Sequence, residues 1–204
     1  MSEPLLRAVA VMDQLRSPGG CPWDAAQTHR SLATYLLEET YETLEAIETD
    51  DTALLREELG DLLLQVLFHA RLAEELPEGE RFSIDDVASD LVAKLVHRHP
   101  HVFADVKVGG AAEVNENWER LKAEEKARAS IVEGVPMGQP ALALAAKLVS
   151  RAQRAGTDVP IAGDGFGRRL FELVREAVAA GVDPELALRE TSRAYRDALA
   201  GQAR

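Results

Sequence analysis

The sequence predicts an all-α protein built as an antiparallel helical bundle. Alanine, leucine and glutamate are plentiful, aromatic residues make up only 5% of the chain, and no segment reads convincingly as a β-strand. Apolar residues account for 46% of the 204 residues, enough to form a core. That length suits one domain, or one domain and the remnant of a second.

The N-terminal part is expected to start with an amphipathic helix over about residues 5–16. Residues 17–23 contain two prolines and two glycines, which break this helix and form a loop. Asp24 followed by Gln27 resembles a capping box, which would start a short turn or the next helix.

Two long helices are expected next, over about residues 31–48 and 53–75. Residues 50–52 read Asp-Asp-Thr, which stops the first of these helices and caps the second. Because the link is so short, the two helices are predicted to lie side by side and antiparallel.

Two further helices complete this part of the chain. Ser83 with Asp86 predicts a capped helix that continues to about residue 98, and Pro100 ends it. Another helix is expected over about residues 112–129. Few of these helices could bury both faces alone, so we expect the chain to form oligomers.

The C-terminal part is expected to be a separate, smaller helical module. Residues 132–140 carry two glycines and two prolines and predict a linker. Helices are predicted over about 141–155 and 165–180, and a last one begins at Asp183, an N-cap followed by proline at the first helical position.

This C-terminal part resembles a degenerate copy of the preceding one. Residues 60–67 can be laid on residues 167–174, and a loop and a capped helix follow both. In that alignment Arg168 replaces Asp61, and a cation there would repel a metal. The similarity is weak, so chance helical patterning remains an alternative reading.

Four acids at helical spacing are the main lead to function. Glu39 and Glu42, and then Glu58 and Asp61, form two pairs spaced (i, i+3), so each pair projects from one side of a helix. Each pair interrupts an otherwise apolar stripe, where an unpaired charge is costly to bury. Hard divalent cations take oxygen ligands, so Mg²⁺ is the natural partner and Mn²⁺ its substitute.

The alternative is that these acids belong to two solvated acidic faces. Two pairs on apolar stripes, joined by one tight link, favour the metal site over that alternative. The two faces would comprise Glu38, Glu39, Glu42, Glu45 and Glu48 on one helix, and Glu57, Glu58 and Asp61 on the other.

Charge and composition narrow the partners. The net charge of −12 argues against a nucleic-acid polymer. Cys21 is the only cysteine, so no intrachain disulfide can form, and a cytoplasmic location fits. No apolar run approaches a membrane span, and the N-terminus does not look like a signal peptide. The lack of a phosphate-binding G-x-x-x-x-G-K-[ST] motif argues against a P-loop NTPase.

The motifs together resemble the MazG family of nucleoside triphosphate pyrophosphohydrolases over about residues 5–130. E-E-x-x-E with E-x-x-D alone is moderately specific, and the accompanying landmarks make the resemblance strong. The motifs are Glu38-Glu39-x-x-Glu42, Glu58-x-x-Asp61, Cys21-Pro22-Trp23-Asp24, Gln27-Thr28-His29, Gly60-Asp61-Leu62-Leu63 and Arg98-His99-Pro100-His101-Val102-Phe103.

The resemblance implies a fold, an activity and an assembly. Family members are all-α and form dimers around active-site four-helix bundles. With Mg²⁺ they hydrolyse nucleoside triphosphates to the monophosphate and pyrophosphate, and clearing of aberrant nucleotides is a family-level expectation. Many carry two modules, so residues 1–131 would be the catalytic domain, 132–140 the linker and 141–204 a degenerate second module.

The resemblance also implies roles for individual residues. The metal ligands would be Glu39, Glu42, Glu58 and Asp61. Glu38 would activate the attacking water or bind a second metal. Lys94 and Arg98 match a K-x-x-x-R that touches the nucleotide, and Trp118 matches a tryptophan that could stack on the base, with Lys122 a weaker candidate.

Several alternatives remain open from the sequence. Lys94 and Arg98 could be a solvated basic helix end, and Trp118 a core residue. Trp23 and His29 could line the pocket or pin their loop to the core. A zinc site of His97, His99 and His101 is disfavoured by its spacing. A non-enzymatic interaction module, or a relative dedicated to one nucleotide such as dUTP or phosphoribosyl-ATP, would be the alternative functions.

Overall fold

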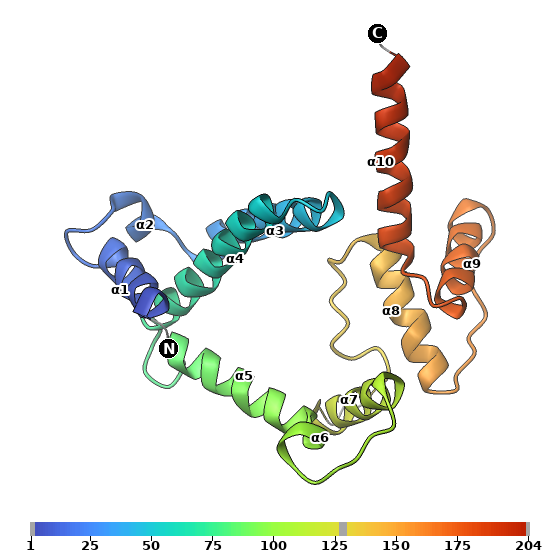
Figure 1. Ribbon diagram of the computed structural model, residues 1–204, viewed down its shortest axis with the longest axis horizontal. Coiled ribbons are helices and arrows are strands. Elements are labelled where there is room, and N and C mark those ends of the chain that lie inside the picture. Colours follow the sequence, from blue (N-terminus) through green and yellow to red (C-terminus); the bar gives the residue numbers. More distant parts are fainter. Residues whose placement is uncertain (1–2, 127–129, 203–204) are drawn as a thin grey trace. The chain divides into compact units, whose positions relative to one another are not determined.

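The computed structural model describes residues 3–126 and 130–202 and confirms the all-α prediction. Within these residues the chain forms ten helices and no strand (Figure 1). No described helix is both long and apolar enough to cross a membrane. Contacts divide the chain into two compact units, one ending at Trp118 and the other beginning at Glu119. The domain boundaries expected at 131 and 140 concern modules of sequence, and they stay a prediction.

An antiparallel pair of long helices dominates the first unit. Helices α3 (His29–Glu48) and α4 (Thr52–Ala73) lie side by side, as the short link predicts (Figure 1). Helix α1 (Glu3–Arg16) packs on α4, and together with α3 they enclose the core. The buried residues of that core are Met12, Leu32, Leu67, Phe68 and Leu72.

The α3–α4 link is closed by local hydrogen bonds. The Asp51 carboxylate accepts from the backbone N–H groups of Ala53 and Leu54, both at 3.0 Å, and so caps α4. Asp50 has a φ of 55°, the left-handed conformation that reverses the chain after the α3 C-cap, Thr49. These two residues fix where the acid pairs of the two helices meet.

The loop after α1 contains a short helix whose start differs from the expectation. Helix α2 (Pro22–Ala26) begins at Pro22, and no capping box forms between Asp24 and Gln27. The Gln27 side chain instead donates to the Trp23 carbonyl, and the capping box belongs to Thr28 and Ser31 at the start of α3. The expectation was wrong because a proline suits the first helical position without a side-chain cap.

Helices α5 (Ile84–Arg98) and α6 (Pro100–Phe103) follow α4. The capping box of Ser83 and Asp86 is confirmed, since Ser83 Oγ accepts from the Asp86 N–H and Asp86 accepts from the Ser83 N–H. Pro100 ends α5 as expected but also begins α6, which was not anticipated. Helix α7 (Ala111–Lys126) comes next, and the last residues expected in it, 127–129, lie outside the described part.

The second unit is built on helices α8 (Ala141–Arg154), α9 (Phe166–Ala179) and α10 (Pro184–Gln202). These bounds confirm the expected helices to within a residue, and Asp183 caps α10 as predicted. Helix α8 packs against both α9 and α10. Arg151 of α8 donates to the carbonyls of Ile131 and Glu133. The proposed repeat relationship stays a prediction.

Candidate metal and substrate site

The α3–α4 pair brings three of the four predicted metal ligands together. Glu39, Glu58 and Asp61 each offer a carboxylate oxygen, and these oxygens lie within 4.8 Å of one another. Ligands of one octahedral Mg²⁺ lie about 2.9 Å apart when adjacent and about 4.2 Å apart when opposite, so the three oxygens would draw closer together to share one cation. Among the described residues, these three acids are the group whose ligand atoms lie close enough together to hold a metal. The histidines at 97, 99 and 101 do not form such a group.

The position of each acid follows from the helix period and the antiparallel packing. Glu58 is buried, with 7% of its surface exposed, whereas Glu39 and Asp61 are half-buried. Glu42 is exposed and lies outside the group of three, although its charge acts on both Glu39 and Glu58. Glu38, one residue before Glu39, is exposed and projects about 100° around the helix from Glu39.

The electrostatics of the cluster disfavour three ionised carboxylates and favour a cation beside them. Burial raises the pKa of Glu39 above its ordinary value, and the negative charges of Asp61 and Glu42 raise it further. Burial is also the first cause of the raised pKa of Glu58, followed by the charges of Glu42 and Asp61. The buried Oε2 atom of Glu58 has no hydrogen-bond partner. A buried carboxylate oxygen without a donor is costly, and a hard divalent cation would satisfy it.

The seam between α3 and α4 continues beyond the acids as a polar and aromatic strip. Gln65, one turn after Asp61, is buried, and its Oε1 atom has no hydrogen-bond partner. Next along the seam, the rings of His29 and His69 stack with centroids 5.0 Å apart and planes 2° from parallel, and their Nδ1 atoms are 2.7 Å apart. One Nδ1–H therefore donates to the other ring. Burial lowers the pKa of His69, and the neighbouring His29 lowers it further.

The predicted substrate-binding cations lie on α5. Lys94 is exposed, and the surrounding apolar residues of α5 are also largely uncovered. Arg98 is buried, and its guanidinium carbon lies 5.3 Å above the centre of the Trp118 ring. His99 meets the same indole edge-on at 4.8 Å. The structure therefore joins Arg98 to Trp118, whereas Lys94 lies exposed one turn earlier on α5. Lys122 follows Trp118 by one turn on α7 and is half-buried.

Trp23 pins its loop to the helical pair. Its ring meets Tyr35 of α3 at 5.9 Å and Phe68 of α4 at 6.5 Å, both in edge-to-face geometry. His29 does the same for the start of α3 through His69. His69 belongs to none of the motifs, but it extends the stripe of Glu58, Asp61 and Gln65 by one turn, and that periodicity could have predicted its contact with His29.

Comparison with known proteins decides the family. Residues 27–103 match the MazG nucleotide pyrophosphohydrolase domain. A protein from Escherichia coli K12 named nucleoside triphosphate pyrophosphohydrolase is 44% identical over 87% of this chain and 69% of its own length. The chain belongs to the MazG family. The match contains Glu38, all four predicted metal ligands, Lys94 and Arg98, and it ends before Trp118.

Two other relatives align along nearly the whole chain. A 26.1 kDa protein of Streptomyces cacaoi is 57% identical over 96% of the chain and 81% of its own length. A Mycobacterium tuberculosis protein, named nucleoside triphosphate pyrophosphohydrolase, is 48% identical over 97% of the chain. The chain spans 57% of the length of that mycobacterial relative, so the latter carries a large additional part.

Proposed function

We propose that this protein hydrolyses ribonucleoside and deoxyribonucleoside triphosphates to the monophosphate and pyrophosphate. The observation that carries the proposal is the convergence of the Glu39, Glu58 and Asp61 carboxylates, together with the buried Oε2 atom of Glu58, which has no hydrogen-bond partner. Membership of the MazG family and the names of the Escherichia coli and Mycobacterium tuberculosis relatives support the same reaction. They favour an enzyme over a non-enzymatic interaction module.

The proposed cofactor is Mg²⁺, with Mn²⁺ as a substitute. Glu39, Glu58 and Asp61 would hold it, and the nearby Glu42 would become the fourth carboxylate when the like charges are neutralised. Their all-oxygen donor set suits a hard cation and not zinc. Such a cation supplies charge neutralisation for the triphosphate and lowers the pKa of a bound water.

The chain's own residues would position the reactants. Glu38 would accept a proton from the attacking water, whose oxygen forms a bond to the α-phosphorus while the bond from that phosphorus to the bridging oxygen breaks. Pyrophosphate leaves with the bridging oxygen. Lys94 and Arg98 would bind the departing phosphates, and Trp118 would contact the nucleotide. Catalysis of this kind rests on placement and charge, so a covalent nucleophile is not required.

The proposed assembly is a homodimer, or a higher oligomer built from it, that completes a four-helix bundle. The α3–α4 pair supplies two of the four helices that such a bundle needs, and a second copy would supply the others. Large apolar side chains on α3, α4 and α5 are exposed in the single chain, which is the condition that association relieves. The most exposed are Leu37, Ile47, Leu59, Val66, Leu91 and Val92.

Product identity tests the reaction. The purified protein is incubated with Mg²⁺ and each common ribo- and deoxyribonucleoside triphosphate, and the products are separated by ion-exchange chromatography. Equal amounts of monophosphate and pyrophosphate are expected. Release of orthophosphate and a diphosphate would contradict the proposal, because the bond broken would then be the outer one. We also propose that the protein acts in the cytoplasm and removes aberrant nucleotides there. Including oxidised nucleotides among the substrates tests that role.

A further inference from the structure

A half-exposed tryptophan lies beside the seam that carries the acids. Trp23 exposes 50% of its surface, although its ring is fixed edge-on by Tyr35 and Phe68. A large aromatic side chain that is both exposed and held in one place offers a ready contact surface, because little conformational freedom is lost when something stacks on it.

The backbone that carries Trp23 is held by a buried arginine. The Arg16 side chain is only 7% exposed, and its Nη1 donates to the carbonyls of Asp24 at 2.5 Å and Gln27 at 3.2 Å. Its other two nitrogens donate to the two carboxylate oxygens of Glu75, each at 2.8 Å. One guanidinium thus ties α1, the segment after Trp23 and the end of α4 together.

A second set of hydrogen bonds fixes the same corner from α3. Gln27 Nε2 donates to the Trp23 carbonyl at 3.0 Å, and Ser31 Oγ donates to Gln27 Oε1 at 2.7 Å. The segment is therefore tied at both of its ends, and the indole has a defined place relative to α3 and α4.

The separation between this indole and the acids suits a nucleotide. Tyr35, which Trp23 touches, is one turn before Glu39, about 6 Å along the axis of α3. Phe68 is about two turns beyond Asp61 on α4, roughly 10 Å away. A nucleotide places its base one ribose away from the α-phosphate, so a phosphate at the acids puts the base within reach of Trp23.

We infer that Trp23 stacks on the purine or pyrimidine base of the substrate and that Arg16 is the residue that positions it. The inference rests on the proposed function. It adds a base contact to the one expected of Trp118, whose ring already contacts the Arg98 guanidinium and the His99 ring. Stacking is tolerant of base identity, since every base has a π-face, so this contact favours nucleotides over inorganic triphosphates without selecting one base.

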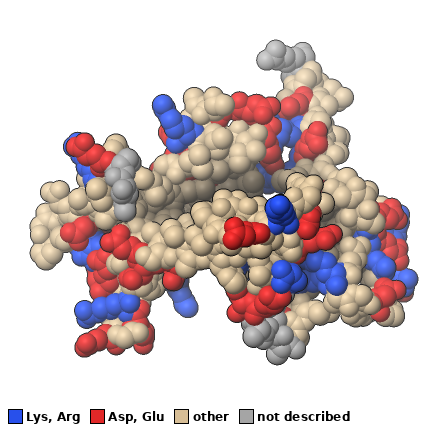
Figure 2. Space-filling model, turned by 60° about the horizontal axis from the view of Figure 1, so that its bottom comes forward, with Lys and Arg blue, Asp and Glu red and all other residues tan. Residues whose placement is uncertain are grey.

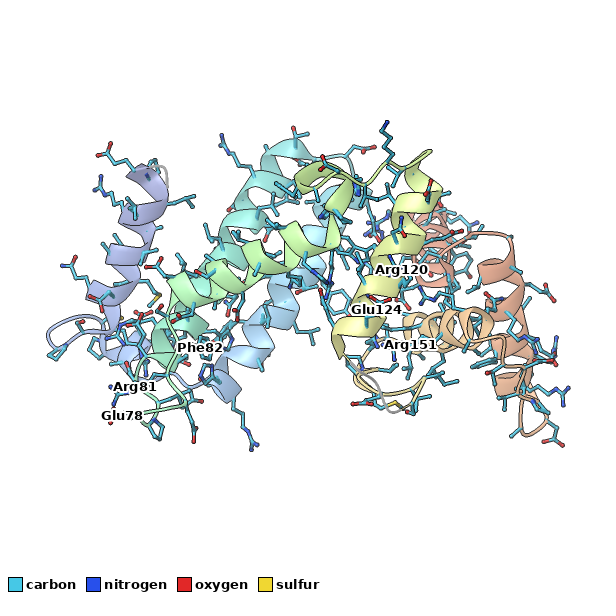
Figure 3. All side chains as sticks on the ribbon, turned by 90° about the horizontal axis from the view of Figure 1, so that it is seen from below. Glu78, Arg81, Phe82, Arg120, Glu124 and Arg151 are labelled. Carbon is cyan, nitrogen blue, oxygen red and sulfur yellow. The ribbon has the colours of Figure 1, made fainter. Side chains whose placement is uncertain are left out.

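Product inhibition separates a base contact from a general effect, because AMP carries a base and inorganic pyrophosphate does not. W23L is expected to raise the inhibition constant of AMP about tenfold, while that of pyrophosphate stays within about twofold. W23F keeps an aromatic face and should retain most of the affinity for AMP. F82L is the matched control, since Phe82 is an exposed aromatic residue in the loop before α5 (Figure 3) and should leave both constants unchanged.

Intrinsic fluorescence gives a second readout that does not need turnover. The chain has two tryptophans, so the difference between wild type and W23F reports Trp23. AMP should quench the wild-type emission, and W23F should lose most of that quenching. Quenching that is equal in both proteins would assign the base contact to Trp118 alone and overturn the inference.

R16K tests the positioning role. Lysine keeps the charge opposite Glu75 but cannot reach both carbonyls, so the AMP constant should rise while kcat and the pyrophosphate constant stay near wild type. A fall in thermal stability without a selective loss of AMP affinity would make Arg16 structural only.

If W23L instead raises both constants alike or changes the oligomeric mass, the stacking role is wrong. If the wild type releases no pyrophosphate, the proposed reaction fails, but the AMP titration still decides whether Trp23 contacts a base.

Discussion

At the scale of single residues, Glu58 is the acid on which the site depends most. It is buried, one of its oxygens has no partner, and three neighbouring negative charges add to the burial that raises its pKa. Glutamate at this position is therefore unfavourable for the metal-free fold, and the metal that we propose there would account for it.

Changing Glu58 to glutamine separates these two effects. E58Q keeps the shape but removes the charge, so turnover is expected to fall about 100-fold or more, and Mg²⁺ should no longer raise the melting temperature. The metal-free melting temperature should equal or exceed that of the wild type, because repulsion within the cluster falls. E57Q, at an exposed neighbour outside the three-carboxylate group, is the control. An active E58Q enzyme would exclude Glu58 as a ligand.

The raised and lowered pKa values near the site predict how pH changes the stability of the metal-free protein. Because the pKa values of Glu39 and Glu58 lie above 4.5 in the folded protein, the metal-free fold binds more protons than the unfolded chain just above that pH. Its free energy of unfolding therefore falls as pH rises through the raised pKa values. His69, with a pKa below 6.5, acts oppositely: the unfolded chain binds the extra proton, and stability falls as pH drops below 6.5.

Protons and Mg²⁺ compete for the same oxygens, so the rise in melting temperature caused by Mg²⁺ should be small at about pH 5 and larger at about pH 8. Thermal scans with Mg²⁺ and with EDTA across that range measure this difference. The same Mg²⁺ effect at both ends of the range would show that the ion binds elsewhere.

At the scale of elements, the sequence predicts most where the deciding contacts are local. The caps made by Asp51, Ser83 and Asp183 are confirmed, because a cap is an interaction between residues two or three apart. The capping box expected of Asp24 and Gln27 was wrong, because the Gln27 side chain bonds to the Trp23 carbonyl and the Ser31 hydroxyl instead. The bonds between Arg16 and Glu75 join residues 59 apart, and no spacing rule reveals such a pair.

The four acids illustrate the same limit within the site. Helical spacing places Glu39, Glu58 and Asp61 on facing sides, and the structure brings them together. Helical spacing could not show that Glu42 is more exposed and lies outside that group, because its position depends on how α3 is rotated against α4. The sequence also does not reveal that Arg98 is buried against Trp118 while Lys94 is exposed, because that contact joins residues 98 and 118 from two different helices.

Adjacent residues in the α3–α4 link predict opposite effects on stability. Asp50 adopts a left-handed φ of 55° at the C-terminus of α3, where both its side chain and its negative charge are unfavourable. D50G should therefore raise the free energy of unfolding by about 0.5–1 kcal/mol. D51A removes the α4 cap and should lower it by about 1 kcal/mol. Urea denaturation measures both, and changes of the same sign would contradict the assigned geometry.

At the scale of the whole molecule, the net charge disfavours one class of partner and the exposed apolar surface favours another. Acidic and basic side chains are mixed over the face shown in Figure 2, and the net charge is −12, which does not favour a nucleic-acid polymer. The apolar side chains of α3, α4 and α5 in the first unit favour another protein surface, and we propose that this surface is a second copy.

Light scattering after size-exclusion chromatography tests the assembly. The wild type is expected at twice the mass of one chain, or at a multiple of that. V92E places a charge on the uncovered side of α5, where Val92 is 59% exposed, and should weaken association about tenfold or more. V159E is the matched control, since Val159 is 62% exposed in the second unit. A wild-type monomer with full activity would contradict the proposed dimer.

The α3–α4 seam is fastened at both ends, with the acids midway between. The tight reversal at Asp50 and Asp51 closes one end, and the stacked imidazoles of His29 and His69 close the other. Mutual repulsion among the carboxylates therefore cannot be relieved by the two helices swinging apart, as it could if one end were loose. The ion that we propose would therefore meet two helices whose spacing is already fixed, and the carboxylate side chains would make the remaining adjustment.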